Sequence, residues 1–143
     1  MPANWDESME TGDPHIDGQH RGIIELVDRL DEIGADDVSW MRHAHEILDQ
    51  VMDLTVTHFN TEELLMVRVG YPADAQERML EQHREFKAYA RLRVLEFRAG
   101  DRSGLALLPG FLRMWLAEHE FGLDCELVSW LRSHTDDEVT VRA

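Results

Sequence analysis

Imidazole and carboxylate side chains recur in this chain at spacings that would bring them to one face of a helix. In "THFNTEE", His58 and Glu62 stand at i and i+4, about 40° apart around a helix axis. In "WLAEHEFGLD", His119, Glu120 and Asp124 fall on two successive turns, and Glu120 lies inside the arc of about 140° between the other two. If His119 and Asp124 both reach the interior, Glu120 must face it as well. Nitrogen and oxygen donors in this pattern indicate one wall of a metal site.

Two further histidines lie on the other apolar stretches. His20 ends "HIDGQH", and Asp17, three residues earlier, would either hold the other ring nitrogen or cap a helix. His83 lies in "MLEQHREF", with Met79 four residues before it on the same helical face. A lone histidine on a helix is usually a surface residue or a satisfied core residue, and an i,i+4 His/Glu pair is common by chance. The hypothesis of a metal site therefore rests on the four histidines together.

Glycine and proline residues divide the chain into four long stretches with helical periodicity. They span about residues 18–33, 38–69 and 73–99, and a fourth that begins near 103 or 110 and ends near 133. Pro109 leaves the start of the fourth stretch open, because proline suits a first turn and disrupts a helix interior. Signals for strands and hairpin turns are absent. We therefore predict an all-α, up-down-up-down four-helix bundle with an N-terminal arm.

Length and charge restrict the domain organisation and the partners. The 143 residues predict a single domain, with an arm over 1–15, a bundle over about 16–133 and a loose tail over 134–143. The net charge of -15 argues against nucleic acid or anionic lipid as a partner. No apolar run is long enough to cross a membrane, and no signal pattern or cysteine pair occurs, so we expect a cytoplasmic protein. We also expect a monomer, because no apolar stripe is left unexplained.

A bundle of this kind would bring one histidine from each helix, and carboxylates from two helices, into a common interior layer. Facing helices build carboxylate-bridged dimetal sites in this way. The mixture of imidazole and carboxylate, without a thiolate, suits iron or manganese better than structural zinc. The ferritin-type Glu-x-x-His pattern is absent.

The pattern resembles the hemerythrin family of non-haem diiron bundles, including the bacteriohemerythrins. The matching pieces run from about Trp5 to Leu131 and are Trp5, "IDGQH", "HFNTEELLM", "GYP", "HREF" and "WLAEHEFGLD". The resemblance implies two iron ions, bridged by carboxylates and by an oxo or hydroxo group, with dioxygen as the ligand. It implies that the iron is bound by His20, His58, His83 and His119 and bridged by Glu62 and Asp124.

The chain departs from the family pattern at two positions. Met79 stands where the family usually has a first histidine of the third helix, and Glu120 stands where an aliphatic residue usually lines the oxygen pocket. A buried carboxylate is costly unless it is paired or metal-bound. We therefore hypothesise that Glu120 replaces the lost imidazole as an iron ligand. The alternative is that Glu120 hydrogen-bonds water or a neighbour beside an open iron position, and Met79 is expected to fill the core rather than bind metal.

These features predict a protein that binds, senses or reacts with dioxygen or a related small oxidant such as peroxide. Extra carboxylate donation should stabilise oxidised iron, so faster autoxidation and weaker reversible oxygen binding are expected than is usual for the family. One alternative is an enzyme, a diiron peroxidase or oxidase, and another is a metal store or a structural bundle. A sensor would also need an output partner. None is present in these 143 residues, and an output domain is expected if they are a fragment of a longer sensor.

The remaining histidines are expected to be structural. His43 and His45 lie too far along the second helix from His58 to share its layer. His15 is expected before the first helix and His134 in the tail. Trp115 and Leu116 are expected to form core and pocket lining.

Overall fold

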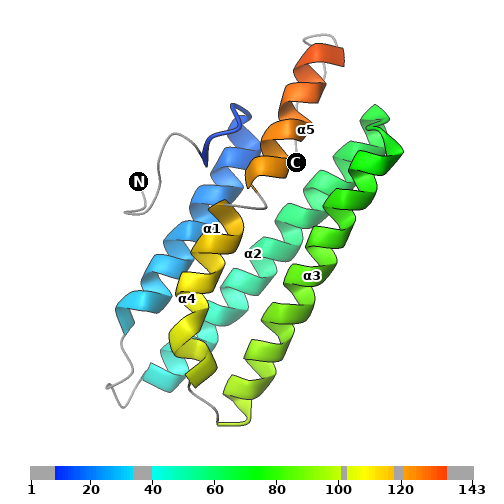
Figure 1. Ribbon diagram of the computed structural model, residues 1–143. Coiled ribbons are helices and arrows are strands. Elements are labelled where there is room, and N and C mark those ends of the chain that lie inside the picture. The colour runs from blue at the N-terminus through cyan, green and yellow to red at the C-terminus, as the bar shows by residue number, and fades with distance from the viewer. Residues whose placement is uncertain (1–8, 34–39, 101–102, 118–120, 135–143) are drawn as a thin grey trace.

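The computed structural model describes residues 9–33, 40–100, 103–117 and 121–134. Five helices lie within these residues: α1 (Pro14–Ile33), α2 (Trp40–Val69), α3 (Ala73–Arg98), α4 (Ser103–Trp115) and α5 (Phe121–His134). Helices α1, α2 and α3 run side by side, while α4 and α5 follow one another along the fourth position (Figure 1). The described residues contain no strand, which confirms the prediction of an all-α bundle. No described helix combines the length and apolar content that crossing a membrane requires.

Helix α1 begins earlier than the sequence analysis predicted. Asp13 caps it, because its Oδ1 atom accepts bonds from the backbone N–H groups of His15 (2.9 Å) and Ile16 (3.0 Å). Pro14 occupies the first helical position, where its missing N–H costs nothing. The predictions of a start near Gly18, of an arm that includes His15 and of a capping role for Asp17 were therefore wrong.

The connection between α2 and α3 follows the sequence signals closely. Gly70 adopts a positive φ of 70°, which lets the chain leave the helix without a clash from a side chain. The Tyr71 N–H then returns to the carbonyl of Met66 at 3.0 Å. Pro72 precedes α3 with φ of -53° and ψ of 138°, and its ring restricts φ at the point where that helix begins.

The predicted single fourth helix is two helices in the structure. Pro109 lies inside α4, so the earlier of the two predicted starts holds. After Trp115 the next two residues continue in a wider, π-type turn, and α5 begins at Phe121. His134 is the last residue of α5, so its assignment to the tail was wrong. Trp5 and residues 135–143 lie outside the described residues.

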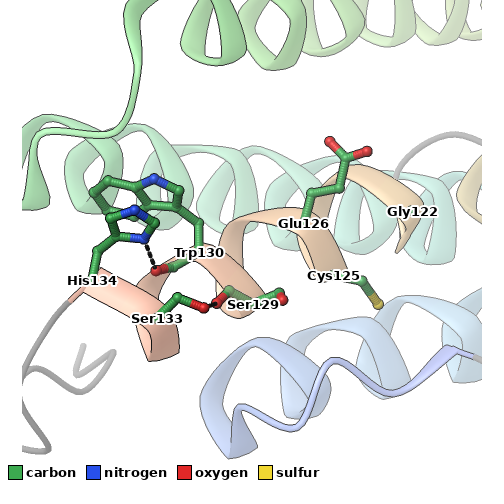
Figure 2. A pocket seen from close by; sticks show the side chains of 7 residues that line it. All are labelled: Gly122, Cys125, Glu126, Ser129, Trp130, Ser133 and His134. Carbon is green, nitrogen blue, oxygen red and sulfur yellow. Dashed lines mark hydrogen bonds between the residues drawn. The ribbon is translucent and has the colours of Figure 1, made fainter.

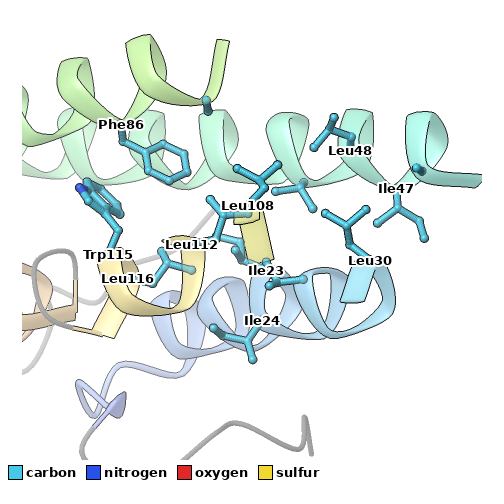
Figure 3. Close-up of a cluster of buried hydrophobic side chains, with 14 of the residues drawn as sticks. Ile23, Ile24, Leu30, Ile47, Leu48, Phe86, Leu108, Leu112, Trp115 and Leu116 are labelled. Carbon is cyan, nitrogen blue, oxygen red and sulfur yellow. The ribbon is translucent and has the colours of Figure 1, made fainter. Parts of the chain in front are cut away.

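Two apolar clusters fill the bundle. The main core includes Ile23, Ile24, Leu48, Phe86, Leu112, Trp115 and Leu116 (Figure 3). Phe59 belongs to the same cluster. The end core includes Ile16, Leu65, Met66, Tyr71, Met79, Leu127, Val128 and Leu131. Trp115 and Leu116 are thus core residues, as predicted.

The polar residues lie between the two clusters along the helices. His20 falls between Ile16 and Ile23, His58 between Val51 and Leu65, His83 between Met79 and Phe86, and Asp124 between Leu116 and Leu127. Helices α1, α2, α3 and α5 therefore each present a described donor at the boundary between the two apolar clusters. This arrangement places His20, His58 and Asp124 in a common layer, with apolar packing on both sides.

Candidate metal centre

Four donor side chains from three helices meet in the interior. They are His20 of α1, His58 and Glu62 of α2, and Asp124 of α5, and all four are fully buried. One ligand atom from each residue lies within 4.8 Å of all the others. This quartet joins positions that are 104 residues apart in the chain.

The donor atoms are spaced as ligands around one ion would be. The Nε2 atoms of His20 and His58 are 3.0 Å apart, and Asp124 Oδ2 lies 2.6 Å from the first and 3.0 Å from the second. Glu62 Oε1 also contacts His58 Nε2. Adjacent ligands of an octahedral ion at about 2.1 Å are themselves about 3.0 Å apart. The observed spacing therefore fits a divalent cation among these atoms.

Charge gives a second reason for a cation. Two buried carboxylates would be costly together unless a positive charge balances them. Burial by itself would raise the pKa of Asp124, but the close side chains of Glu62, His20 and His58 hold that pKa below its ordinary value. The Oδ1 atom of Asp124 is buried without a hydrogen-bond partner among the described residues. An ionised carboxylate with an unused oxygen matches the requirements of a metal ligand.

His83 lies on α3, between Met79 of the end core and Phe86 of the main core, and is not a member of the quartet. Its ring is fully buried and stacks on Phe59, with ring centroids 3.9 Å apart. Its Nδ1 atom lies 3.4 Å from Oε1 of Glu63. Phe86 and Trp115 pack around Phe59, so an aromatic wall separates this side of the layer from water.

His119 and Glu120 lie outside the described residues, so the hypothesis that Glu120 replaces an imidazole stays a prediction. Met79 is buried in the end core, in agreement with its predicted role as core filler. His45 packs against Phe97 in the main core, and its position 13 residues before His58 keeps it outside the donor layer. The predicted donors that the structure brings together are thus His20, His58, Glu62 and Asp124.

Asp17 has a role that neither sequence alternative foresaw. Its Oδ1 atom accepts bonds from the N–H and the hydroxyl of Thr11, both at 2.8 Å, and its Oδ2 atom accepts the N–H of Gly12 at 3.1 Å. The carbonyl of Gly12 accepts a bond from Arg132 of α5 at 2.8 Å. Asp17 therefore ties the segment before α1 to the bundle and, through Gly12, to the helix that carries Asp124.

Cys125 follows Asp124 but turns away from the donors. Its thiol contacts the carbonyl of Glu10 at 3.7 Å, and burial together with the charges of Asp124 and Asp17 raises its pKa. A surface hollow on α5 is lined by Gly122, Cys125, Glu126, Ser129, Trp130, Ser133 and His134 (Figure 2). This hollow is open to solvent and is lined by none of the four donors, so it is separate from the candidate metal site.

Sequence reasoning missed two residues that contact the donor histidines from outside. Gln19 reaches His58, and Glu63 reaches His83. Each directly neighbours a predicted donor in the sequence, His20 and Glu62 respectively. A residue next to a ligand on a helix lies about 100° around the axis and can face a neighbouring helix, which is the signal that could have identified both.

A helical bundle with a buried layer of imidazole and carboxylate donors defines a class of metal-binding α-helical proteins. The chain matches the family model "Hemerythrin HHE cation binding domain" over residues 11–139, and it belongs to the hemerythrin family.

Comparisons with curated proteins agree with this membership. The chain is 35% identical over 132 residues to a bacteriohemerythrin of Stenotrophomonas maltophilia, covering 91% of this chain and 82% of the relative. It is 31% identical over 117 residues to a bacteriohemerythrin of Pseudomonas aeruginosa, covering 80% and 72%. A hemerythrin-like protein of Naegleria gruberi is 26% identical over 127 residues, covering 86% and 88%. No solved structure matches the chain significantly.

Proposed function

We propose that this protein is a hemerythrin-like non-haem diiron protein that binds, senses or reacts with dioxygen or a related small oxidant. The observation that carries the proposal is the buried quartet, whose four donor atoms lie within 4.8 Å of one another. Membership of a cation-binding family supports the same conclusion. Bound iron would supply Lewis acidity and reversible electron exchange at this place.

The proposed ligand set extends the quartet to the whole layer. It comprises His20, His58, Glu62, His83, His119, Glu120 and Asp124. The Nδ1 contact of His83 with Glu63 supports its inclusion, because a metal-binding histidine commonly places its other ring nitrogen against a carboxylate. Glu62 and Asp124 are proposed as bridges, since each can offer two oxygens.

The surroundings of His83 support a small, uncharged ligand such as dioxygen. Phe59 stacks on the His83 ring with an angle of 14° between the planes, and Phe59 packs edge-on against Phe86. These side chains are buried, so the layer is shielded from bulk water on this side. An apolar wall admits a small apolar molecule more readily than a hydrated ion.

Metal loading tests the proposal directly. The metal-free protein is loaded with ferrous iron without air, and bound iron is counted per chain. We expect two iron ions in the wild type and fewer in the Asp124→Asn variant. Glu126→Gln on the same helix is the matched control, because Glu126 is exposed and is expected to leave the iron count unchanged. A wild-type protein that retains no iron would refute the proposal.

Glu120 separates an oxygen-binding or sensing protein from the enzyme alternative, a diiron peroxidase or oxidase. If Glu120 donates to iron, the iron-loaded wild type should oxidise quickly in air. The double variant Met79→His/Glu120→Leu restores both family-typical residues and should oxidise more slowly, with a reversible change in visible absorption on cycling air. Steady-state consumption of peroxide that is fast in the wild type and lost in Glu120→Leu would favour the enzyme.

We also propose that the protein is cytoplasmic and monomeric. Metal storage without redox chemistry is the remaining alternative. It would be favoured if iron were bound and released with no spectral response to air or peroxide.

A further inference from the structure

The His58 ring is held from behind by a side chain of the neighbouring helix. Its Nδ1 atom lies 2.7 Å from Oε1 of Gln19 on α1. The amide nitrogen of Gln19 donates to the Thr61 hydroxyl at 3.1 Å, and that hydroxyl donates to the carbonyl of Thr57 at 3.0 Å. These hydrogen bonds connect Thr57 and Thr61 of α2 to Gln19 of α1, and Gln19 to His58 of α2.

This chain of bonds has only one consistent direction. A backbone carbonyl can only accept, so the Thr61 hydroxyl must donate to Thr57 and use its lone pair to accept from Gln19. The Gln19 amide group is then turned so that its oxygen faces His58. Because that oxygen can only accept, the proton of the His58 ring must reside on Nδ1.

The position of this proton determines what the Nε2 atom of His58 can do. With the proton on Nδ1, the Nε2 atom of a neutral His58 presents its lone pair to the quartet, where Asp124 Oδ2 lies 3.0 Å away. A neutral imidazole needs this tautomer to bind a metal through Nε2.

The histidine on α3 is held by a different kind of partner. His83 Nδ1 faces the carboxylate of Glu63 at 3.4 Å, whereas His58 Nδ1 faces the neutral amide of Gln19. A carboxylate draws the Nδ1 proton more strongly than an amide does and makes the imidazole a better electron donor to a metal. The two ligands would therefore differ in donor strength although both are histidines.

We propose that Gln19, anchored by Thr61, is a positioning residue that fixes the metal-binding tautomer of His58. Because Gln19 is neutral and Glu63 is charged, His58 is also a weaker electron donor to the metal than His83. This inference rests on the proposed metal-binding function and concerns how unequal the ligands are. The unequal donation would make one end of the centre easier to oxidise than the other.

The positioning role is tested by affinity for Co²⁺, measured in competition with a chelator. Gln19→Leu, which keeps the volume and removes both bonds, should bind about 10- to 100-fold more weakly. Thr61→Val removes only the anchoring hydroxyl and should cost about 2- to 10-fold, the value of one hydrogen bond, and Thr61→Ser should restore the affinity. Gln50→Leu, an exposed amide on α2, is the matched control and should match the wild type.

A second readout reports the tautomer itself. In the Zn²⁺-loaded protein, which is diamagnetic, the Nδ1 proton of His58 should give a protected low-field NMR signal. That proton should exchange faster with water in Thr61→Val, and Thr61→Ser should restore its protection. A general loss of packing would instead speed the exchange of backbone amides across α1 and α2, which serves as the internal control.

The difference in donor strength is tested by exchanging charges. Gln19→Glu should lower the reduction potential of the iron-loaded centre, and Glu63→Gln should raise it. A purely structural effect has no reason to shift the potential in opposite directions. If Gln19→Leu does not fold, Thr61→Val and Gln19→Glu still decide the proposal.

The outcomes separate this inference from the proposed function. Wild-type affinity and wild-type NMR protection in the Gln19 and Thr61 variants would overturn the inference. Reduction potentials that move in the same direction in Gln19→Glu and Glu63→Gln would also overturn it. In either case, stoichiometric metal binding would leave the proposed function intact. If wild-type protein binds no metal, or if His58→Ala binds as tightly as the wild type, both the proposed function and the inference fail.

Discussion

Gly22 offers a sharp test of how closely α1 must approach α2. A Cβ atom added at Gly22 would lie 2.9 Å from Cδ2 of Leu54, whereas a Cβ added at Gly18 would meet no atom within 4 Å. Carbon atoms in ordinary contact are about 3.5–4.0 Å apart, so alanine at position 22 is roughly 0.6–1.1 Å too close. Both glycines lie inside α1, two residues on either side of the donor His20.

The two positions form a matched pair. Each Gly→Ala change gains about 0.5–1 kcal/mol because the unfolded chain loses backbone freedom. That gain cancels in the comparison, so the difference between the variants measures the strain at Leu54. Overpacking costs typically 1–3 kcal/mol, and the half-buried Leu54 can turn aside, which places the strain near the lower limit. We expect Gly18→Ala to be more stable than wild type, and Gly22→Ala to be about 1 kcal/mol less stable than Gly18→Ala.

The assay is urea unfolding of the metal-free variants, followed by helical circular dichroism. A double-mutant cycle of Gly22→Ala with Leu54→Ala should show a coupling of at least about 0.5 kcal/mol, since the two side chains would touch. Co²⁺ affinity then shows which part yields: a reduced affinity means that α1 and His20 move away from His58, and an unchanged affinity means that Leu54 moves. The reasoning is refuted if the two alanine variants have equal stability and Leu54 shows no coupling.

Three further changes have expected results. Addition of Co²⁺ at about 1,000 times its Kd should raise the free energy of unfolding by about 4 kcal/mol, and chelation or Asp124→Asn should abolish that gain in thermal denaturation. Arg113 donates to Asp28 at 2.7 Å and to Asp31 at 3.0 Å, so Arg113→Gln should destabilise the metal-free protein by about 1 kcal/mol in urea unfolding, and an unchanged midpoint would contradict this. Burial, and secondarily the charge of Glu126, raises the pKa of Tyr71, so its contribution to stability should be complete below pH 10.0 and be lost as the pH rises through the folded-state pKa. Absorbance titration near 295 nm and Tyr71→Phe, which should lack that loss, check the last prediction.

The sequence by itself determined the helical class and the donors that lie on a single helix. Helical periodicity and the glycines at 70 and 100 predicted where α2 and α3 end, because local backbone preferences act over a few residues. The i,i+4 spacing of His58 and Glu62 guaranteed that they share a face, since helix geometry alone fixes that relation. The same local signals were available at Asp13 and Pro14, where an N-cap followed by proline marks the true start of α1.

The change from regular α-helix to a π-type turn after Trp115 lay beyond those local rules. The sequence left the start of this helix open between about 103 and 110, and the structure places Pro109 within α4. The chain leaves regular α-helix only after Trp115. Packing against α1 and α3 can hold a proline inside a helix, because the burial of Leu108 and Leu112 stabilises the segment around it.

Only the tertiary structure decided which atoms meet across helices. No local rule places Nε2 of His20 2.6 Å from a carboxylate 104 residues away, or turns Asp17 towards Thr11. Such distances depend on how closely helices pack, and here a single glycine, Gly22, permits the close approach of α1 to α2. Gln19 contacts His58 across the same pair of helices. Residue types and spacing thus predicted the donors, while interhelical packing set their distances and the partners that hold them.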